Sequence, residues 1–351
     1  MSATTNRGEI IEHTVPAVER RFLRRPGIVW TPGFLIGVLL LAAAVLVLGL
    51  YGSTYILALG SKVAIFAIVI LGLVLLVGFG GQISFGQNAF FGIGGYIAAL
   101  ASTSWGLPPL VGVVLGALLA CGVAAVIGFP TLRLRGHFLA LGTFAVGLGF
   151  YAFAVSSPFF NGFAGIGGIP PFSVGALEFA SPFSKFWLCG AVMIVALIAV
   201  SHLREGRWGR SLRTLSSDEA TAQSIGIDVH RTKLTAFVLS ALFASVAGSL
   251  YAFTVSYVSP ETFSFATILT FFTMLFIGGV KSVWGALLGS SVVTVIPELV
   301  PPALATWEPT IFGVILVVVL ILRPSGILAG KSAPTPALSK LLGRFSRNGD
   351  R

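Results

Sequence analysis

The sequence predicts an all-α integral membrane protein, a polytopic helical bundle of about ten spans, within a range of eight to ten. Of its 351 residues 56% are hydrophobic and only 10% are charged, and the mean hydropathy is +0.96. A soluble domain carries about a quarter charged residues. From Val63 to Leu132 there is no Asp, Glu, Lys or Arg. The apolar runs do not alternate with period two, which argues against a barrel of short strands.

Charges and turn residues divide the chain into ten candidate spans, each long enough or nearly long enough to cross a hydrocarbon layer. The first apolar run, 33–61, is too long for the core of a signal peptide, so we expect it to remain in the chain as a span. The last two candidates are short, and re-entrant segments are an alternative there. The candidate spans are residues 33–53, 63–79, 84–102, 109–130, 137–156, 186–203, 233–257, 264–280, 283–299 and 309–322.

Basic residues orient the bundle, because cytoplasmic loops carry an excess of Lys and Arg. Ten alternating spans place on one face Arg20 to Arg25, Arg133 and Arg135, Arg204 to Lys233, Lys281 and Arg323 to Arg351. The other face receives Lys62 and Lys185 with Glu178, Glu261, Glu298 and Glu308. Both termini are therefore expected in the cytoplasm. The expected domains are a cytoplasmic tail at 1–32, a membrane domain at 33–328 and a cytoplasmic tail at 329–351. Within the membrane domain we expect an external loop at 157–184 and a cytoplasmic loop at 204–231.

The formal net charge of +10 follows from this arrangement. Most of it forms a basic rim on the cytoplasmic side, where contact with anionic lipid is expected. It therefore does not indicate a nucleic-acid partner.

The cytoplasmic loop contains a short helix with both ends specified by sequence. Ser216 and Glu219 have the spacing of a capping box, in which the hydroxyl accepts from the Glu219 amide and the carboxylate reaches back. Gly226 supplies a left-handed residue that ends the helix. A helix of ~2.5 turns is marginal alone in water, so it is expected to dock on a partner. A protein partner is favoured over the lipid surface, because the apolar face of Ala220, Ala222 and Ile225 is small.

A second motif, Gly80 to Tyr96, places polar side chains inside an apolar region. Unsatisfied amides are costly in hydrocarbon, so these side chains must face other helices, water or a solute. Two interpretations remain open: close helix packing, which uses small residues and amides, and a share in a solute path. The preceding glycines favour a backbone break. The candidate path residues are Gln82, Ser84, Gln87, Asn88, Gly92 and Tyr96.

Enzyme chemistry finds little support. The four histidines are scattered, and Cys121 and Cys189 stand singly in apolar runs. The segment Gly326 to Ser332 ends like a phosphate-binding loop but lacks the loop's glycine spacing. The twelve Asp and Glu fall in expected loops or tails or, in the case of Glu298, at the very end of a candidate span, so no acid deep inside the membrane is expected for proton coupling. Transport would then be driven by a sodium ion or by a partner ATPase that pushes on the capped helix.

Several motifs together resemble the permease subunits of branched-chain amino-acid ABC importers, specifically the M-type of the two paired permeases. They are "GFGGQISFGQNAFFGIGGY", "TLRLRGHFLALGT", "GRSLRTLSSDEATAQSIGIDVHRTKLTAFVLSALFASVAGSLYA", "FIGGVKSVWGALLG" and "IFGVILVVVLILRPSGIL", and the resemblance covers Leu57 to Leu328. It implies that Glu219 to Gly226 is a coupling helix that inserts into an ATPase. The chain departs from the family pattern at Asn161 to Phe163 and after Thr143, which leaves the solute open.

The resemblance also implies the partners and the location. These are a second related permease, two cytoplasmic ATPases that bind ATP and Mg²⁺, an extracytoplasmic solute-binding protein and the lipid of a bacterial inner membrane, with no cofactor on this chain. The expected function is half of a translocation pathway for branched-chain or related hydrophobic amino acids. Alternatives are a permease for urea or short amides, a self-sufficient carrier or channel and, as a distant third, a membrane-embedded enzyme.

Overall fold

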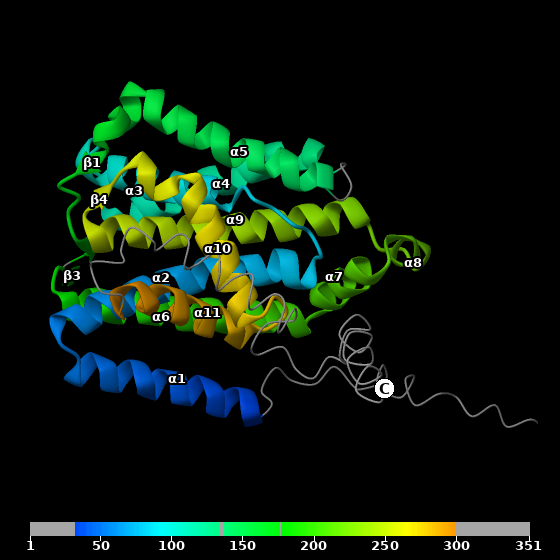
Figure 1. Ribbon diagram of the computed structural model, residues 1–351, viewed down its shortest axis with the longest axis horizontal. Coiled ribbons are helices and arrows are strands. Elements are labelled where there is room, and N and C mark those ends of the chain that lie inside the picture. Colours follow the sequence, from blue (N-terminus) through cyan, green and yellow to red (C-terminus); the bar gives the residue numbers. More distant parts are fainter. Residues whose placement is uncertain (1–31, 133–136, 176, 300–351) are drawn as a thin grey trace, which may run out of the picture.

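The computed structural model describes residues 32–132, 137–175 and 177–299, and this part of the chain is a bundle of helices (Figure 1). Most helices run side by side between two ends of the bundle. One end, at the right of Figure 1, carries the short helices α7 and α8 and is called the α8 end. The opposite end carries the short β-strands and is called the strand end.

Six helices in the described part are long and apolar enough to cross a membrane. A helix rises 1.5 Å per residue, so about 20 residues cross the hydrocarbon layer. This confirms an all-α, multi-pass membrane protein. The six are α1 (Pro32–Tyr51), α2 (Thr54–Leu73) with its π-helical continuation Val74–Phe79, α4 (Pro109–Thr131), α5 (His137–Ser156), α6 (Pro182–Glu205) and α9 (Val229–Val255).

Three shorter helices complete the bundle: α3 (Gln87–Thr103), α10 (Phe265–Gly278) and α11 (Val283–Leu299). Each of the first nine candidate spans thus contains a helix. The tenth, 309–322, lies outside the described residues, as do the C-terminal tail and all but the last residue of the 1–32 tail. The total number of spans remains a prediction.

Some predicted boundaries were wrong, because caps decide where helices start. The second span begins at Thr54, nine residues before the predicted 63, and the hydroxyl of Ser53 accepts from the Ile56 amide at 3.4 Å. Lys62, predicted between spans, therefore lies inside α2 with its side chain exposed. At the third span the helix starts later than predicted, at Gln87, because residues 80–86 are not helical.

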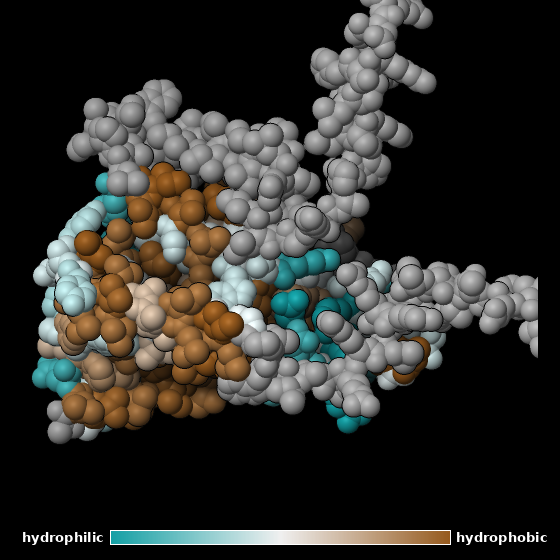
Figure 2. Space-filling view, turned by 90° about the horizontal axis from the view of Figure 1, so that it is seen from below, coloured by the Kyte–Doolittle hydropathy of each residue, from teal (hydrophilic) through white to brown (hydrophobic). Residues whose placement is uncertain are grey.

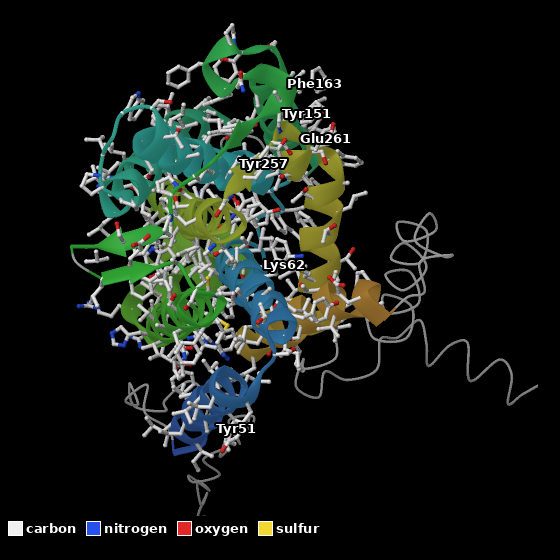
Figure 3. All side chains as sticks on the ribbon, turned by 90° about the vertical axis from the view of Figure 1, so that its left-hand side faces the viewer. Tyr51, Lys62, Tyr151, Phe163, Tyr257 and Glu261 are labelled. Atoms are coloured by element: carbon white, nitrogen blue, oxygen red, sulfur yellow. The ribbon has the colours of Figure 1, made fainter. Side chains whose placement is uncertain are left out.

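The predicted loop 157–184 is partly ordered into short strands at the strand end. β1 (Ile166–Gly167) pairs antiparallel with β4 (Tyr257–Val258), and β2 (Phe172–Val174) pairs antiparallel with β3 (Leu177–Phe179). Figure 3 looks at this end, with Phe163 and Tyr257 labelled. The loop also closes over α3, since the Phe160 ring stacks on Tyr96 with centroids 4.4 Å apart.

The core of the bundle is the seam between α3 and α9. Every residue of α3 from Gln87 to Ala101 is buried. A β-carbon on Gly94 would overlap the carbonyl oxygen of Ser245, and one on Gly248 would overlap that of Phe91. Ser249 donates to the Gly94 carbonyl at 3.0 Å. Since lipid offers little hydrophobic drive for helix association, this close contact holds the two helices together.

The outer surface is suited to lipid. Figure 2 shows a broad hydrophobic face, with hydrophilic residues gathered toward its two ends. Exposed apolar side chains on α1, α4 and α5, such as Leu39, Val126 and Leu141, contribute to the apolar surface of the bundle. This distribution fits helices that cross the hydrocarbon layer with their ends in the polar headgroup region.

A single methyl group at the α3 seam should destabilise the protein. Gly94→Ala forces the two backbones apart, and overpacking of this kind costs about 1–3 kcal/mol. Gly122→Ala on α4 is the matched control, because Gly122 is exposed and a β-carbon there meets nothing within 4 Å. That variant should be neutral or gain up to about 1 kcal/mol of helix propensity. Thermal unfolding in detergent measures both, and equal melting temperatures would contradict the packing described for α3.

Candidate functional site

The segment between α6 and α9 forms two helices at the α8 end. α7 (Arg207–Ser217) buries Gly209, Leu212 and Leu215 and leaves Arg207 and Arg210 exposed. It is thus an amphipathic helix whose apolar stripe packs on the bundle. Its neighbours include α6, α9 and the π-helical end of α2. α8 (Glu219–Ser224) follows after one residue.

The predicted capping box at the start of α8 is wrong. Ser216 and Ser217 still belong to α7, and the Ser216 hydroxyl donates to the Arg213 carbonyl at 2.9 Å. The cap is Asp218, whose extended backbone separates the two helices. Its carboxylate accepts from the amides of Ala220 at 3.0 Å and Thr221 at 3.3 Å.

The capping contacts of Asp218 also bear on its acidity. The Thr221 hydroxyl, followed by the Ala220 amide, lowers the pKa of Asp218 below its usual value. Hydrogen bonds to the ionised form have this effect, so the cap is present in its charged, accepting form at neutral pH.

The predicted stop at Gly226 is confirmed. Its φ is +80°, in the left-handed region that glycine adopts without steric cost. The Gly226 amide donates to Gln223 at 3.0 Å and the Ile227 amide donates to Ala222 at 3.0 Å, which is the hydrogen-bond pair of a Schellman motif. With six residues, α8 is shorter than the predicted helix.

One side of α8 is docked on the chain itself. Ala222 is fully buried, and the Glu219 carboxylate forms an ion pair with Lys233 of α9. The other side is open, and 64% of the Ile225 side chain is exposed. An apolar side chain in this position, on a helix at the polar end of the bundle, is a feature that protein interfaces use.

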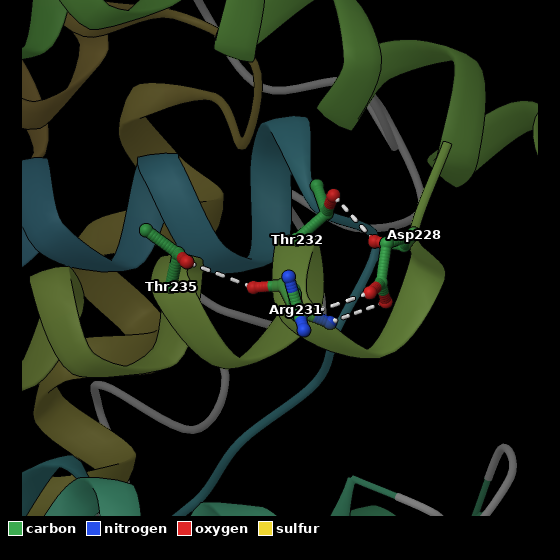
Figure 4. Close-up of polar contacts among 4 residues, drawn as sticks. All are labelled: Asp228, Arg231, Thr232 and Thr235. Atoms are coloured by element: carbon green, nitrogen blue, oxygen red, sulfur yellow. Dashed lines mark hydrogen bonds and ion pairs between the residues drawn. The ribbon is translucent and has the colours of Figure 1, made fainter. Parts of the chain in front are cut away.

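The start of α9 holds the other end of this element. Figure 4 shows Asp228 accepting from the Arg231 amide at 3.0 Å and forming an ion pair with its side chain at 3.1 Å. Thr232 donates to the Asp228 carbonyl at 2.7 Å, and Thr235 donates to the Arg231 carbonyl at 2.8 Å. α8 is thus bracketed by two aspartate caps, Asp218 and Asp228. Sequence reasoning missed both, together with Lys233, although an Asp three residues before Thr221 or Arg231 is a recognisable capping signal.

Residues 80–86 form a break in the backbone between the π-helical end of α2 and α3. Gly81 has a φ of +65°. The break lies against α7: a β-carbon on Gly81 would be 3.2 Å from the Ser216 β-carbon, and one on Gly80 would be 3.5 Å from a Leu212 methyl. The break predicted for the Gly80 to Tyr96 motif is therefore present, and it touches the helix that leads into α8.

The polar residues of this motif are all buried. The Gln87 side-chain amide donates to the Ser240 carbonyl at 2.9 Å, and the Asn88 amide donates to those of Phe263 at 2.7 Å and Gly147 at 3.3 Å. A β-carbon on Gly92 would overlap the Phe150 ring. The stripe thus faces the interior, and most of it contributes to helix packing.

Two of these residues, Gln82 and Tyr96, have no side-chain hydrogen bond in the described structure: the Tyr96 hydroxyl is buried without a partner. Gln82 is 4% exposed, and neither its amide nitrogen nor its amide oxygen has a partner. A buried amide without partners costs on the order of 1–3 kcal/mol per group. Ser84 is also buried, and it accepts from the Gly86 amide at a long 3.5 Å. Helix packing therefore satisfies the amide nitrogens of Gln87 and Asn88, whose amide oxygens have no partner, but neither polar atom of Gln82.

The Asp, Glu, Lys and Arg residues of the described part gather at the two ends of the bundle, with one exception, Lys62 in α2. The acids lie at the strand end (Glu178, Glu261 and Glu298) or on the segment of α7, α8 and their flanks (Glu205, Asp218, Glu219 and Asp228). Among the described residues no cluster of three His, Cys, Asp or Glu is arranged to hold a metal ion.

Comparison with known proteins gives the family. The family model described as the branched-chain amino acid transport system permease component matches residues 55–322. The permease protein LivM of Escherichia coli is 31% identical over 288 residues, which cover 75% of this chain and 68% of that protein. A probable LivM of Methanocaldococcus jannaschii is 22% identical over 289 residues, covering 73% and 83%. The LivH permease of Salmonella typhimurium is 30% identical over 139 residues, covering 39% and 45%. The match of the family model over most of the chain shows that this protein belongs to the branched-chain amino acid ABC transporter permease family.

Proposed function

We propose that this chain is the M-type permease subunit of a bacterial inner-membrane ABC importer for branched-chain or related hydrophobic amino acids. It forms half of a translocation pathway, and the second, related permease forms the other half. The similarity to LivM extends over 75% of the chain, whereas that to LivH covers 39%, which favours the M-type role. The observation that carries the coupling to ATP hydrolysis is α8, a capped and docked helix with an exposed Ile225.

The basic residues support an orientation with the α8 end in the cytoplasm. Arg204, Arg207, Arg210, Arg213, Arg231 and Lys233 all lie on or beside α7, α8 and the start of α9. The strand end carries Lys185 with the acids Glu178, Glu261 and Glu298. By the positive-inside rule the strand end faces outward, toward a solute-binding protein. Because α1 begins at the α8 end, this orientation also puts the N-terminal tail in the cytoplasm.

In this proposal two separate ATPases bind ATP and Mg²⁺, and no cofactor is held by this chain. The contact with an ATPase lies within Ser216 to Gly226. Ala220 and Ile225 are exposed there, Glu219 is partly exposed, and the predicted contact residue Ala222 is instead buried against the chain itself. Movement of α8 reaches the bundle through α7, because Ser216 and Leu212 of α7 lie on Gly81 and Gly80. The break at 80–86 connects directly to α3. The path candidates Gln82, Ser84, Gln87, Asn88, Gly92 and Tyr96 thus lie on the segment that an ATPase would displace.

Reconstitution tests the function. The chain would be co-expressed with its second permease and ATPases and placed in liposomes with the solute-binding protein. ATP-dependent accumulation of radiolabelled leucine is expected. Accumulation of urea or a short amide instead would change the substrate class, and leucine uptake without the ATPases would point to a self-sufficient carrier.

The cap of α8 should be needed for binding the ATPases. Gly226→Val places a β-branched residue in the left-handed region, at a cost of roughly 1–2 kcal/mol, so recovery of the ATPases with the purified permeases should fall about tenfold. The control is Gly226→Asn, since Asn tolerates this conformation and a β-carbon here meets nothing within 4 Å. Co-purification measures both variants. Full ATPase recovery and full transport in the valine variant would contradict the assignment of α8 as the contact with the ATPases.

The contact between α7 and the backbone break should transmit motion. Gly81→Ala presses a methyl group on Ser216, so ATPases should still bind while transport per ATP hydrolysed falls severalfold. Gly106→Ala is the matched control. Gly106 has nearly the same φ, +61°, but a β-carbon added to it would meet no atom within 4 Å. The double variant Gly81→Ala, Ser216→Gly should recover coupling. The ratio of leucine uptake to phosphate release is the measurement, and a defect of equal size in the control would leave only backbone strain.

Cysteine labelling tests the orientation. In a background that lacks Cys121 and Cys189, Glu178→Cys in β3 should react with a membrane-impermeant maleimide in intact cells. Ser217→Cys in α7 should react only after permeabilisation, because the α8 end is placed in the cytoplasm. Both positions are exposed, so access to the thiol depends on the side of the membrane. The reverse pattern would invert the bundle.

A further inference from the structure

Lys62 is a charged residue inside a membrane-spanning helix. It lies eight residues after Thr54, the first residue of α2, which is about 12 Å along the helix axis from the strand end. Its side chain is exposed, and none of the ion pairs among the described residues includes it. A cation at such a depth is costly unless it meets water, a counter-charge or a solute, and is for that reason a candidate functional residue.

The position of Lys62 is central rather than peripheral. α2 packs against α6, α9, α10 and α11, and beyond its first turn only Ala58 and Lys62 of α2 are exposed. In Figure 3, which looks at the strand end, Lys62 lies near the middle of the bundle between α2 and α10. Tyr51 at the end of α1, by contrast, lies at the edge of the bundle in the same view. The exposed Lys62 side chain therefore lies beside α10 on the half of the bundle that is nearer the strand end.

A layer of aromatic rings lies next to Lys62, on the side that is further from the strand end. Phe66, one turn further along the same face of α2, contacts Phe91 of α3 with centroids 6.5 Å apart and Phe271 of α10 at 6.0 Å. Phe91 is the centre of the layer, since it also contacts Phe271 and Phe263 at 5.5 Å and Tyr251 of α9 at 5.7 Å. Phe91, Phe263 and Phe271 are fully buried. Rings from α2, α3, α9 and α10 thus close the bundle below the lysine.

A cation above an aromatic layer matches one kind of solute. An amino acid with a hydrophobic side chain combines a carboxylate, which forms charge-assisted hydrogen bonds with an ammonium group, and an apolar body that packs on aromatic rings. A small apolar pocket with one well-placed charged group is the usual design of a site for such a molecule. Urea or a neutral amide has no carboxylate and gains much less from the lysine.

We propose that Lys62 and the aromatic layer around Phe91 form the outward-facing entry site of the permease, where the ammonium group of Lys62 receives the carboxylate of a hydrophobic amino acid. This inference rests on the proposed function and deepens it. The aromatic layer then acts as the closed barrier between the entry site and the remaining path. Lys62 contributes charge, the partly buried Phe66 contributes apolar surface under the substrate, and the fully buried Phe91 supports Phe66 from behind.

The test uses the complete transporter in liposomes, with its second permease, its ATPases and a saturating amount of leucine-loaded binding protein. Loss of a charged hydrogen bond corresponds to a decrease of about tenfold to hundredfold, and this is expected for leucine uptake by Lys62→Met. Lys62→Arg should retain most of the uptake because it keeps the charge. The control is Lys185→Met: Lys185 also lies at the strand end, but its ammonium group donates to the Thr254 carbonyl at 3.0 Å.

The outcomes separate this inference from the proposed function. If the wild-type transporter carries leucine and Lys62→Met does so at the same rate, Lys62 does not take part and the inference is overturned. It is also overturned if Lys62→Met loses the second permease on purification, since the lysine would then pair with an acid of that subunit. If the wild-type complex does not transport leucine at all, the proposed function fails, and this inference fails with it.

Discussion

The close contact between α3 and α9 is the constraint on which the rest of the structure depends. In lipid the association of helices relies on backbone approach and interhelical hydrogen bonds. α3 is buried on every side, and Gly94 and Gly248 leave no room for a side chain where it meets α9. With α3 enclosed in this way, its polar residues must find partners on neighbouring helices, as Gln87 does on Ser240 and Asn88 does on Phe263. The same enclosure places Phe91 at the centre of the aromatic layer.

The fixed position of α3 gives the break before it a particular role. A helix packed along its whole length moves as one body, so in this proposal a displacement at the α8 end bends the chain at residues 80–86, where Gly81 already adopts a left-handed conformation, and shifts α3 without bending it. α7 lies on this break through Leu212 and Ser216, and α8 follows α7 after a single residue. The route from the proposed ATPase contact to the proposed path is therefore short and consists of direct contacts. It needs no pathway of distant residues, for which coupling evidence would be required.

The sequence was sufficient where one residue determines the local structure, and insufficient where several candidates compete. Gly226 could be predicted as the end of α8, because few other residues take a φ of +80° there without strain. At the other end Ser216, Ser217 and Asp218 are all capping residues by type, and only the packing of Leu212 and Leu215 in α7 extends that helix far enough to leave the cap to Asp218. Similarly, Lys62 resembles a loop residue in sequence. In the structure, the cap at Ser53 starts α2 at Thr54, so the helix includes Lys62, whose side chain is exposed.

Lys62 and Gln82, two polar side chains without a hydrogen bond or ion pair among the interactions described above, lie on opposite sides of the same aromatic layer. Lys62 precedes Phe66 on α2 toward the strand end, and Gln82 follows the π-helical end of α2 toward the α8 end. Between them Phe66, Phe91 and Phe271 are in contact, so on the proposed path a solute would pass only with movement of α3 or α10. Gln82 belongs to the break before α3 that touches α7. In this proposal, a displacement of α7 that moves the break would shift the aromatic layer from the side of the α8 end. The same movement would allow the unpartnered Gln82 amide to form hydrogen bonds.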